Sequence, residues 1–273
     1  MPLPRTPAQR RRKAASSASS TCESLAEFVA AVDRASRDFT PKDVEWYLQP
    51  WFRGHADAGW SLTPGWYRQQ RVRGLGAEFY NEQELLDGFK LRAPMYLERL
   101  PRTDWEWLFL MQHYGLPTRL LDWTESALVA LYFAVGDHQG GADAAVWAIN
   151  PWWINKQALG GFDLFTAESP RAANWAPGKL AADAARAPIA IRPSYESSRI
   201  QAQHGVFTIH GADPGGMETL ADREGCQIRK LVLPARSVGN IRRELSVAGI
   251  SESVVFPELP GLCRELRRFF FGA

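Results

Sequence analysis

Residues 103–135 read TDWEWLFLMQHYGLPTRLLDWTESALVALYFAV, and this stretch indicates how the chain folds. Two apolar segments with helical spacing flank a short polar segment. In the first, Thr103 and Glu106 fit the S/T-x-x-E capping box that begins many helices. The second, from residue 126 to about residue 135, is apolar nearly all round, so we expect a helix inside the core. The stretch therefore predicts a polar loop held at both ends by buried helices.

The polar segment between these helices is rich in hydrogen-bonding side chains. Burying such groups without partners costs about 1–3 kcal/mol each, so they either bond to one another or bind a ligand. A polar loop on a rigid scaffold is typical of binding and catalytic sites. The candidate residues are His113, Tyr114, Thr118, Arg119, Asp122 and Thr124.

Five of these six side chains also have a structural interpretation. Arg119 and Asp122, three residues apart, would form a structural ion pair. Asp122 or Thr124 would cap the second helix. His113 and Tyr114 would satisfy the C-terminus of the first helix, where the helix dipole favours His.

Composition limits the class of protein. The chain has 273 residues, 45% of them hydrophobic, which suffices for one large domain or two small ones. No run approaches the ~20 apolar residues of a membrane span, and the N-terminus lacks the apolar region of a signal peptide. We therefore expect no membrane association. Three widely spaced cysteines (Cys22, Cys226 and Cys263) favour a reducing, cytoplasmic setting and no metal site.

Charge is unevenly distributed along the chain. Residues 1–20 hold five basic residues and no acidic one. Because the whole chain is formally +2, residues 21–273 carry a net charge of −3. The first segment is therefore interpreted as a disordered basic tail. Such tails are most often merely solvated, but this one also suits contact with nucleic acid or with membrane phosphates.

Hydrophobic patterning predicts further elements outside the central stretch. The expected strands are 44–52, 144–149, 189–192, 206–209 and 230–234. The expected helices are 25–36, with Ser20 and Glu23 as its capping box, 78–100, 240–248 and 261–271. Residues 152–187 are interpreted as an insertion with one or two short helices. Strands and helices mix without strict βαβ alternation, which favours an α+β fold with a mixed or antiparallel sheet core and surrounding helices, spanning residues 21–273.

Standard catalytic signatures are absent from the sequence. There is no phosphate-binding loop of Walker type, no G-x-G-x-x-G and no H-E-x-x-H. There is also no G-x-S-x-G elbow, so the sequence gives little support to a hydrolase that uses a catalytic triad.

A set of motifs, in order along the chain, resembles the FRG-domain family. The motifs are Phe52-Arg53-Gly54, GLPTRLLDWT at 115–124, R-x-x-x-Q-x-G-x-F at 199–207 and FPxLxGL at 256–262. The resemblance covers roughly residues 24–265, and the long central motif is its most specific part. It implies a cytoplasmic protein of bacterial type, from a family associated with toxin and phage-defence settings.

The chain resembles the ADP-ribosyltransferases more distantly. Arg53 stands in an aromatic-Arg-Gly sequence at the end of an expected strand, and in that family this Arg contacts NAD. Residues 120–126 run into a helix, as the family's middle motif does. Gln201 and Gln203 precede the strand at 206–209, and Gln203 stands where the family carries its catalytic Glu. The resemblance implies an ADP-ribosyltransferase-like fold with NAD as the substrate.

The chemistry of such a reaction explains why these residue types matter. Cleavage of the nicotinamide–ribose bond passes through an oxocarbenium-like state, as other glycosidic cleavages do. An Arg fork binds phosphate or ribose oxygens, and a carboxylate stabilises the developing positive charge. Gln203 supplies no charge, so the carboxylate would come from Asp122, Glu125 or Glu196.

The resemblance thus implies NAD-dependent transfer of ADP-ribose to a macromolecular acceptor, with RNA or DNA as one acceptor class. A partner protein that inhibits the enzyme fits the toxin setting. The residues assigned to NAD binding are Arg53, Gly54, His113, Tyr114, Thr118, Arg119 and Thr124. The catalytic candidates are Gln203, Glu125 and Asp122.

Two alternatives remain open from the sequence. The first is a non-catalytic module that binds a nucleotide, RNA or a protein, and the amide at Gln203 in place of a carboxylate favours it. The second is a nuclease that works without NAD and uses His55 and His113 as acid and base.

Overall fold

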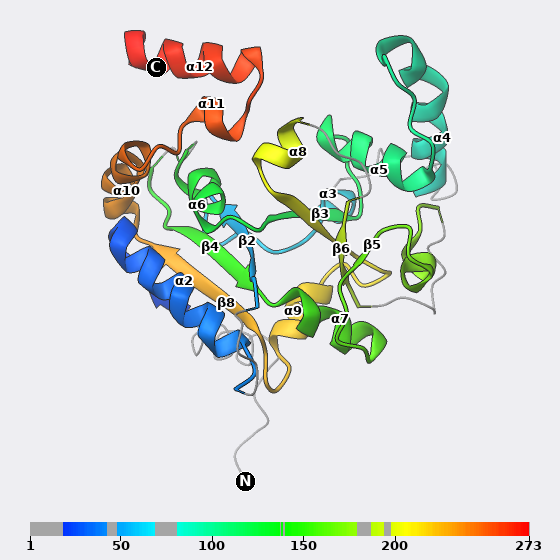
Figure 1. Ribbon diagram of the computed structural model, residues 1–273, viewed down its shortest axis with the longest axis horizontal. Coiled ribbons are helices and arrows are strands. Elements are labelled where there is room, and N and C mark those ends of the chain that lie inside the picture. The colour runs from blue at the N-terminus through cyan, green and yellow to red at the C-terminus, as the bar shows by residue number, and fades with distance from the viewer. Residues whose placement is uncertain are drawn as a thin grey trace.

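The computed structural model describes residues 19–42, 48–68, 81–136, 138, 140–178, 187–193 and 198–272. Figure 1 shows a mixed sheet with helices packed around it, as expected for an α+β fold. The predicted tail lies outside these residues up to residue 18, whereas Ser19 and Ser20 already belong to the first strand. No helix in the described part of the chain has both the length and the apolar character needed to cross a membrane.

The described strands form one eight-stranded sheet in the order β1-β8-β4-β2-β3-β7-β6-β5. Its pairs are antiparallel except at the two edges, where β1 runs parallel to β8 and β5 runs parallel to β6. The sheet is therefore mixed with an antiparallel centre, which confirms the predicted class. The strands are Ser19–Thr21 (β1), Trp51–His55 (β2), Leu120–Thr124 (β3), Ala144–Ile149 (β4), Phe165–Thr166 (β5), Ile189–Arg192 (β6), Gly205–Ile209 (β7) and Ile228–Leu233 (β8).

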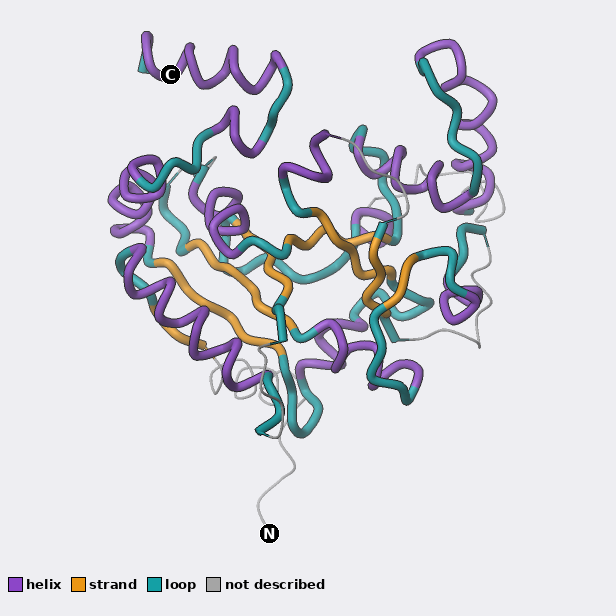
Figure 2. Tube along the Cα trace, viewed as in Figure 1, coloured by secondary structure: helices purple, strands orange, loops and turns teal. Residues whose placement is uncertain are grey.

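The sheet is divided at its centre, between β2 and β3. These strands pair at a single position, Phe52 with Thr124, whereas β2 pairs with β4 and β3 with β7 at five positions each. The two halves of the sheet therefore separate on either side of that one pair. The tube in Figure 2 shows the orange strands as two groups that run in different directions.

Helices cover both halves of the sheet. Figure 1 shows α2 and α10 beside the half that contains β8, while α5 and α8 lie beside the half that contains β3 and β7. The α-helices are Leu25–Phe39 (α2), Gly65–Arg68 (α3), Glu82–Arg92 (α4), Asp104–His113 (α5), Ala127–Val135 (α6), Pro151–Leu159 (α7), Ser198–Ala202 (α8), Gly216–Ala221 (α9), Ala235–Val247 (α10), Glu252–Val255 (α11) and Leu259–Phe271 (α12). Two 3₁₀ helices cover Ala93–Tyr96 (η2) and Pro170–Trp175 (η3).

Helix caps explain where several of these helices begin. Thr103 accepts a hydrogen bond from the Glu106 amide at 3.2 Å, which confirms Thr103 as the cap of α5, while the Glu106 carboxylate accepts from the Arg102 amide at 2.7 Å. The cap predicted for the first long helix is wrong, because Ser20 lies in β1 and Ser24 caps α2 instead. Similarly, α6 is capped by Ser126 and not by Asp122 or Thr124.

The largest correction concerns the polar loop of the central stretch. Its second half, Leu120–Thr124, is β3, a central strand between β2 and β7. The apolar pair Leu120-Leu121 gives too short a pattern to show this from sequence, and the strand is stabilised by pairing with β7, a distant partner. A site residue on this strand is held by the sheet and not by a loop.

Three other element boundaries differ from the predictions. The strand expected at 44–52 is β2, Trp51–His55, while residues 43–47 lie outside the described chain. The helix expected at 78–100 ends as α4 at Arg92 and continues as η2, because Pro94 cannot continue an α-helix. The segment interpreted as an insertion at 152–187 begins within α7, which starts at Pro151, and its Trp153 and Trp175 are buried.

Candidate functional site

A cleft of about 390 Å³ lies where the two halves of the sheet separate. Its walls come from both halves and from the helices beside them, and they combine aromatic rings with a few polar groups. The lining residues are Phe52, Arg53, Gly54, Ala56, Trp60, Phe109, Gln112, His113, Asp122, Trp123, Thr124, Phe133, Ile200, Gln203, Gly205 and Phe207. This volume falls within the range of ordinary small-molecule sites.

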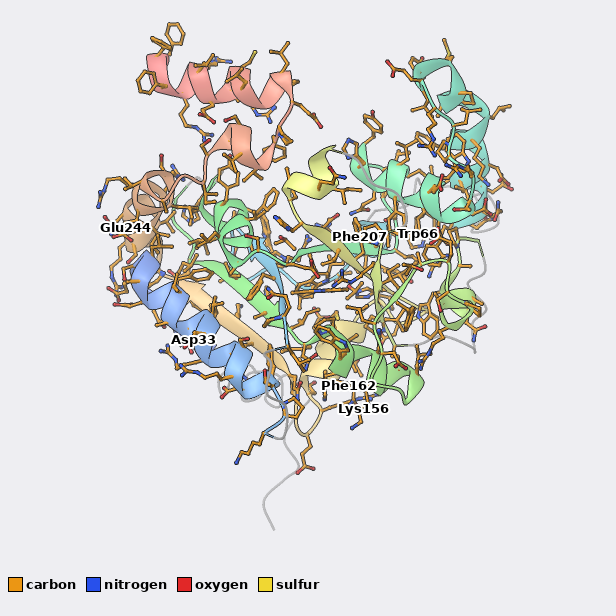
Figure 3. The ribbon with its side chains drawn as sticks, viewed as in Figure 1. Asp33, Trp66, Lys156, Phe162, Phe207 and Glu244 are labelled. Atoms are coloured by element: carbon orange, nitrogen blue, oxygen red, sulfur yellow. The ribbon has the colours of Figure 1, made fainter. Side chains whose placement is uncertain are left out.

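Aromatic side chains form much of the cleft wall. Phe207, labelled in Figure 3, projects from β7 and packs against Phe109 of α5 with ring centroids 5.0 Å apart. Trp60 and Phe133 line the cleft while remaining 54% and 37% exposed. Exposed rings of this kind can stack on a planar ligand.

Arg53 extends from β2 across the division of the sheet. Its Nε donates to His55 Nε2 at 3.0 Å, and its Nη1 donates to the Asp122 carbonyl oxygen at 2.7 Å. Nη1 also lies 3.5 Å from Asp122 Oδ2. Burial lowers the pKa of Arg53, and the Asp122 carboxylate offsets only part of this lowering. A guanidinium has five N–H donors, so these contacts fix its position and leave donors for a ligand.

His55, which accepts the hydrogen bond from Arg53, is only 3% exposed. Burial, assisted by the charge of Arg53, lowers its pKa to about 3. The ring is therefore neutral at neutral pH, and its Nε2 accepts the hydrogen bond from Arg53. This state argues against the nuclease hypothesis, because a neutral imidazole of such low pKa is a poor general acid.

We expect acid to destabilise the fold between about pH 6.5 and pH 3, through His55 and His210, which is fully buried beyond the end of β7. Burial lowers the pKa of both imidazoles from 6.5 to about 3. In this range the unfolded chain binds more protons than the folded chain, so the free energy of unfolding falls as the pH falls.

Thermal unfolding followed from about pH 7.5 to about pH 5 tests this, since carboxylates, with pKa values near 4, contribute mainly below that range. His210→Gln should show a shallower fall in melting temperature than the wild-type chain. Equal slopes would show that His210 does not contribute to the acid sensitivity.

Asp122 lies on β3 with its side chain 54% exposed. Both of its carboxylate oxygens accept from Gln112 Nε2, each at 2.9 Å. Gln112 was not among the residues predicted for the site, because it falls on the apolar face of α5 where a packing role is expected. The available signal was a polar amide in that apolar face, one residue before His113, which also lines the cleft.

Thr124 and Gln203 meet at another wall of the cleft. Thr124 Oγ1 donates to the Gln203 carbonyl oxygen at 2.6 Å and accepts from the Ser126 amide at 2.9 Å. The Gln203 side-chain amide donates to the Val255 carbonyl oxygen at 3.2 Å. These bonds join β3 and α11 through Gln203, the residue that follows α8, so Thr124 has a structural role in addition to lining the cleft.

Arg119 does not face the cleft, which corrects its assignment to NAD binding. Its guanidinium is fully buried and forms two hydrogen bonds with the Glu82 carboxylate, at 2.9 and 2.8 Å. It also donates to the carbonyl oxygens of His210 and Trp175. The predicted ion pair with Asp122 is therefore wrong, and Arg119 instead connects β3 to α4 and η3.

Three other predicted residues lie outside the cleft wall. Thr118 is 1% exposed and bonds to Gln112. Tyr114 is 67% exposed and packs edge-on against His113. Glu125 forms an ion pair with Arg192 at 2.7 Å. The position of Glu196, which was named as a candidate carboxylate, is outside the described residues.

Comparison with known families agrees with the central motif. Residues 49–142 match the family model of the FRG domain. This range contains β2, α5, β3 and α6, which carry most of the cleft wall. No curated protein and no solved structure matches the chain. The motifs at 199–207 and 256–262 lie beyond the matched range.

Proposed function

We propose that this cleft binds NAD and that the protein transfers ADP-ribose to a macromolecular acceptor, on an ADP-ribosyltransferase-like fold. One observation carries the proposal. Arg53 of β2, His113 of α5, Asp122 of β3 and Gln203, which follows α8, line a single cleft. They come from three distant parts of the sequence, at residues 53, 113–122 and 203. Arg53 and Gln203 are among the residues on which the distant resemblance rests.

The polar groups suit the proposed reaction. The bond between nicotinamide and ribose C1′ breaks, and its electron pair leaves with nicotinamide. A nucleophile of the acceptor then bonds to C1′ and loses a proton. Among the lining residues in the described chain, Asp122 is the only carboxylate. It would stabilise the positive charge that develops on the ribose, and Arg53 would bind the pyrophosphate.

The aromatic groups suit the two planar ends of NAD. Trp60 stands at the side of β2, with its ring edge-on to His55 at a centroid distance of 5.9 Å. Phe133 belongs to α6 on another wall. Each offers an exposed ring for stacking on nicotinamide or adenine.

A second candidate function is supported by the same residues. Gln203 is an amide, and the one lining carboxylate already accepts from Gln112 and lies near Arg53. A cleft with its charge balanced in this way would bind a nucleotide without cleaving it. The function is then that of a binding module.

The deciding experiment uses NAD labelled on the adenylate phosphate, incubated with the full chain and, separately, with RNA, DNA or cell lysate. We expect release of nicotinamide and label on one acceptor class. Arg53→Ala should reduce both by about a hundredfold or more. Arg53→Lys should recover little, because lysine lacks the planar fork.

Arg37→Ala, at an exposed ion pair on α2, is the matched control and should keep full activity. Transfer that survives in a folded Arg53→Ala variant would contradict the assignment. Absence of release and transfer in the folded wild-type chain, combined with binding of NAD to it, would leave the binding-module function.

A further inference from the structure

Gln112 lies at the end of α5, half-buried in the cleft wall, and bonds to two residues of the polar segment. Its Nε2 donates to the two oxygens of Asp122 at 2.9 Å each. Its Oε1 accepts from Thr118 Oγ1 at 2.6 Å. The side-chain amide thus connects a buried hydroxyl to an exposed carboxylate.

The direction of each hydrogen bond in this chain is determined. The Leu120 amide can only donate, and it donates to Thr118 Oγ1 at 3.0 Å. The Thr118 hydroxyl proton is therefore free to point at Gln112 Oε1. An amide whose oxygen accepts there must present its NH₂ group to Asp122. A carboxylate can only accept, so the Asp122 carboxylate and the Thr118 hydroxyl together fix the orientation of the amide.

We propose that Gln112 and Thr118 are positioning residues that hold the Asp122 carboxylate in the orientation the reaction needs. This inference rests on the proposed function. It also selects the Asp122 carboxylate, and not Glu125 or the Gln203 amide, as the group that faces the ribose. Thr118, predicted to contact NAD, acts instead through Gln112.

The exposure of Asp122 supports a role in positioning. Its side chain is 54% exposed, and hydrogen bonds and ion pairs at exposed sites contribute little to stability. A carboxylate on an exposed strand face would otherwise rotate among rotamers. Catalytic groups must stay within about 0.5 Å of their productive geometry, so a network that stops this rotation serves a site more than a fold.

The test compares Thr118→Val, which keeps the shape and removes the hydroxyl, with Thr118→Ser, which keeps the hydroxyl. We expect Thr118→Val to lower kcat for nicotinamide release about tenfold, with KM for NAD changed less than twofold. Thr118→Ser should restore most of the loss. Gln112→Met should lower kcat at least as much as Thr118→Val, because it removes both bonds to Asp122.

Two results would overturn the inference. The first is an unchanged kcat in folded Thr118→Val and Gln112→Met variants, combined with an inactive Asp122→Asn variant. This result would exclude the positioning role and leave the proposed function intact. The second result comes from a structural measurement that does not depend on enzymatic activity. The side-chain couplings of Asp122, measured by NMR, should show one rotamer in the wild-type chain and averaging in Gln112→Met. If both chains show the same rotamer distribution, Gln112 does not position Asp122, whether or not NAD is cleaved.

Discussion

Replacing Arg119 with Met is expected to lower the free energy of unfolding by about 3–5 kcal/mol, the range for breaking a buried ion pair. Arg119 is fully buried, and the side chain of Glu82 is 5% exposed. The substitution leaves the Glu82 carboxylate buried without its main partner. It also removes donors from the carbonyl oxygens of His210 and Trp175.

Urea unfolding of the purified chain measures this loss. The control is Arg171→Met, which breaks an ion pair whose side chains are 39% and 55% exposed and should cost less than about 1 kcal/mol. The double variant Arg119→Met with Glu82→Met should regain part of the stability, because no unpaired charge stays buried. A loss in Arg119→Met no larger than that of the control would contradict a structural role for this residue.

Arg119 also shows why the site could be predicted only in part. In the sequence Arg119 stands close to Asp122, whereas its observed partner, Glu82, lies 37 residues earlier in the chain. Nothing local distinguishes an Arg that faces a cleft from one that faces a buried carboxylate. For Arg53, by contrast, the prediction had a local basis in the aromatic-Arg-Gly sequence, although Arg53 is the third of the five residues of β2 and not at the end of a strand.

The fold shows the same contrast between local and distant determinants. Continuous apolar runs predicted β4 and β6 at their observed bounds, and the Thr103 cap predicted the start of α5. The strand β3 was missed because its five residues depend on pairing with β7. The division of the sheet, which creates the cleft, results from a single pairing between β2 and β3 and leaves no local pattern.

Gly54→Ala is expected to destabilise the chain by about 3 kcal/mol or more, at the upper end of the usual cost of overpacking. A Cβ at this position would lie 2.0 Å from the Ala130 carbonyl oxygen and 2.6 Å from the Ala134 amide nitrogen. Both atoms belong to the backbone of α6, so no side chain can move aside. Gly54 was assigned to NAD binding, yet its absent side chain serves the contact between β2 and α6.

The matched control for Gly54→Ala is Gly239→Ala within α10, where an added Cβ meets nothing within 4 Å. Alanine in a helix interior should stabilise this variant by about 0.5–1 kcal/mol. Melting temperatures of the two variants should therefore move in opposite directions. Because Arg53 precedes Gly54 on β2, the overpacked strand should also displace the guanidinium from Asp122 in whatever fraction stays folded, and so weaken the proposed binding of NAD. A Gly54→Ala chain with wild-type stability would show that β2 and α6 can separate without cost, and the close approach of this helix would then not be what requires the glycine.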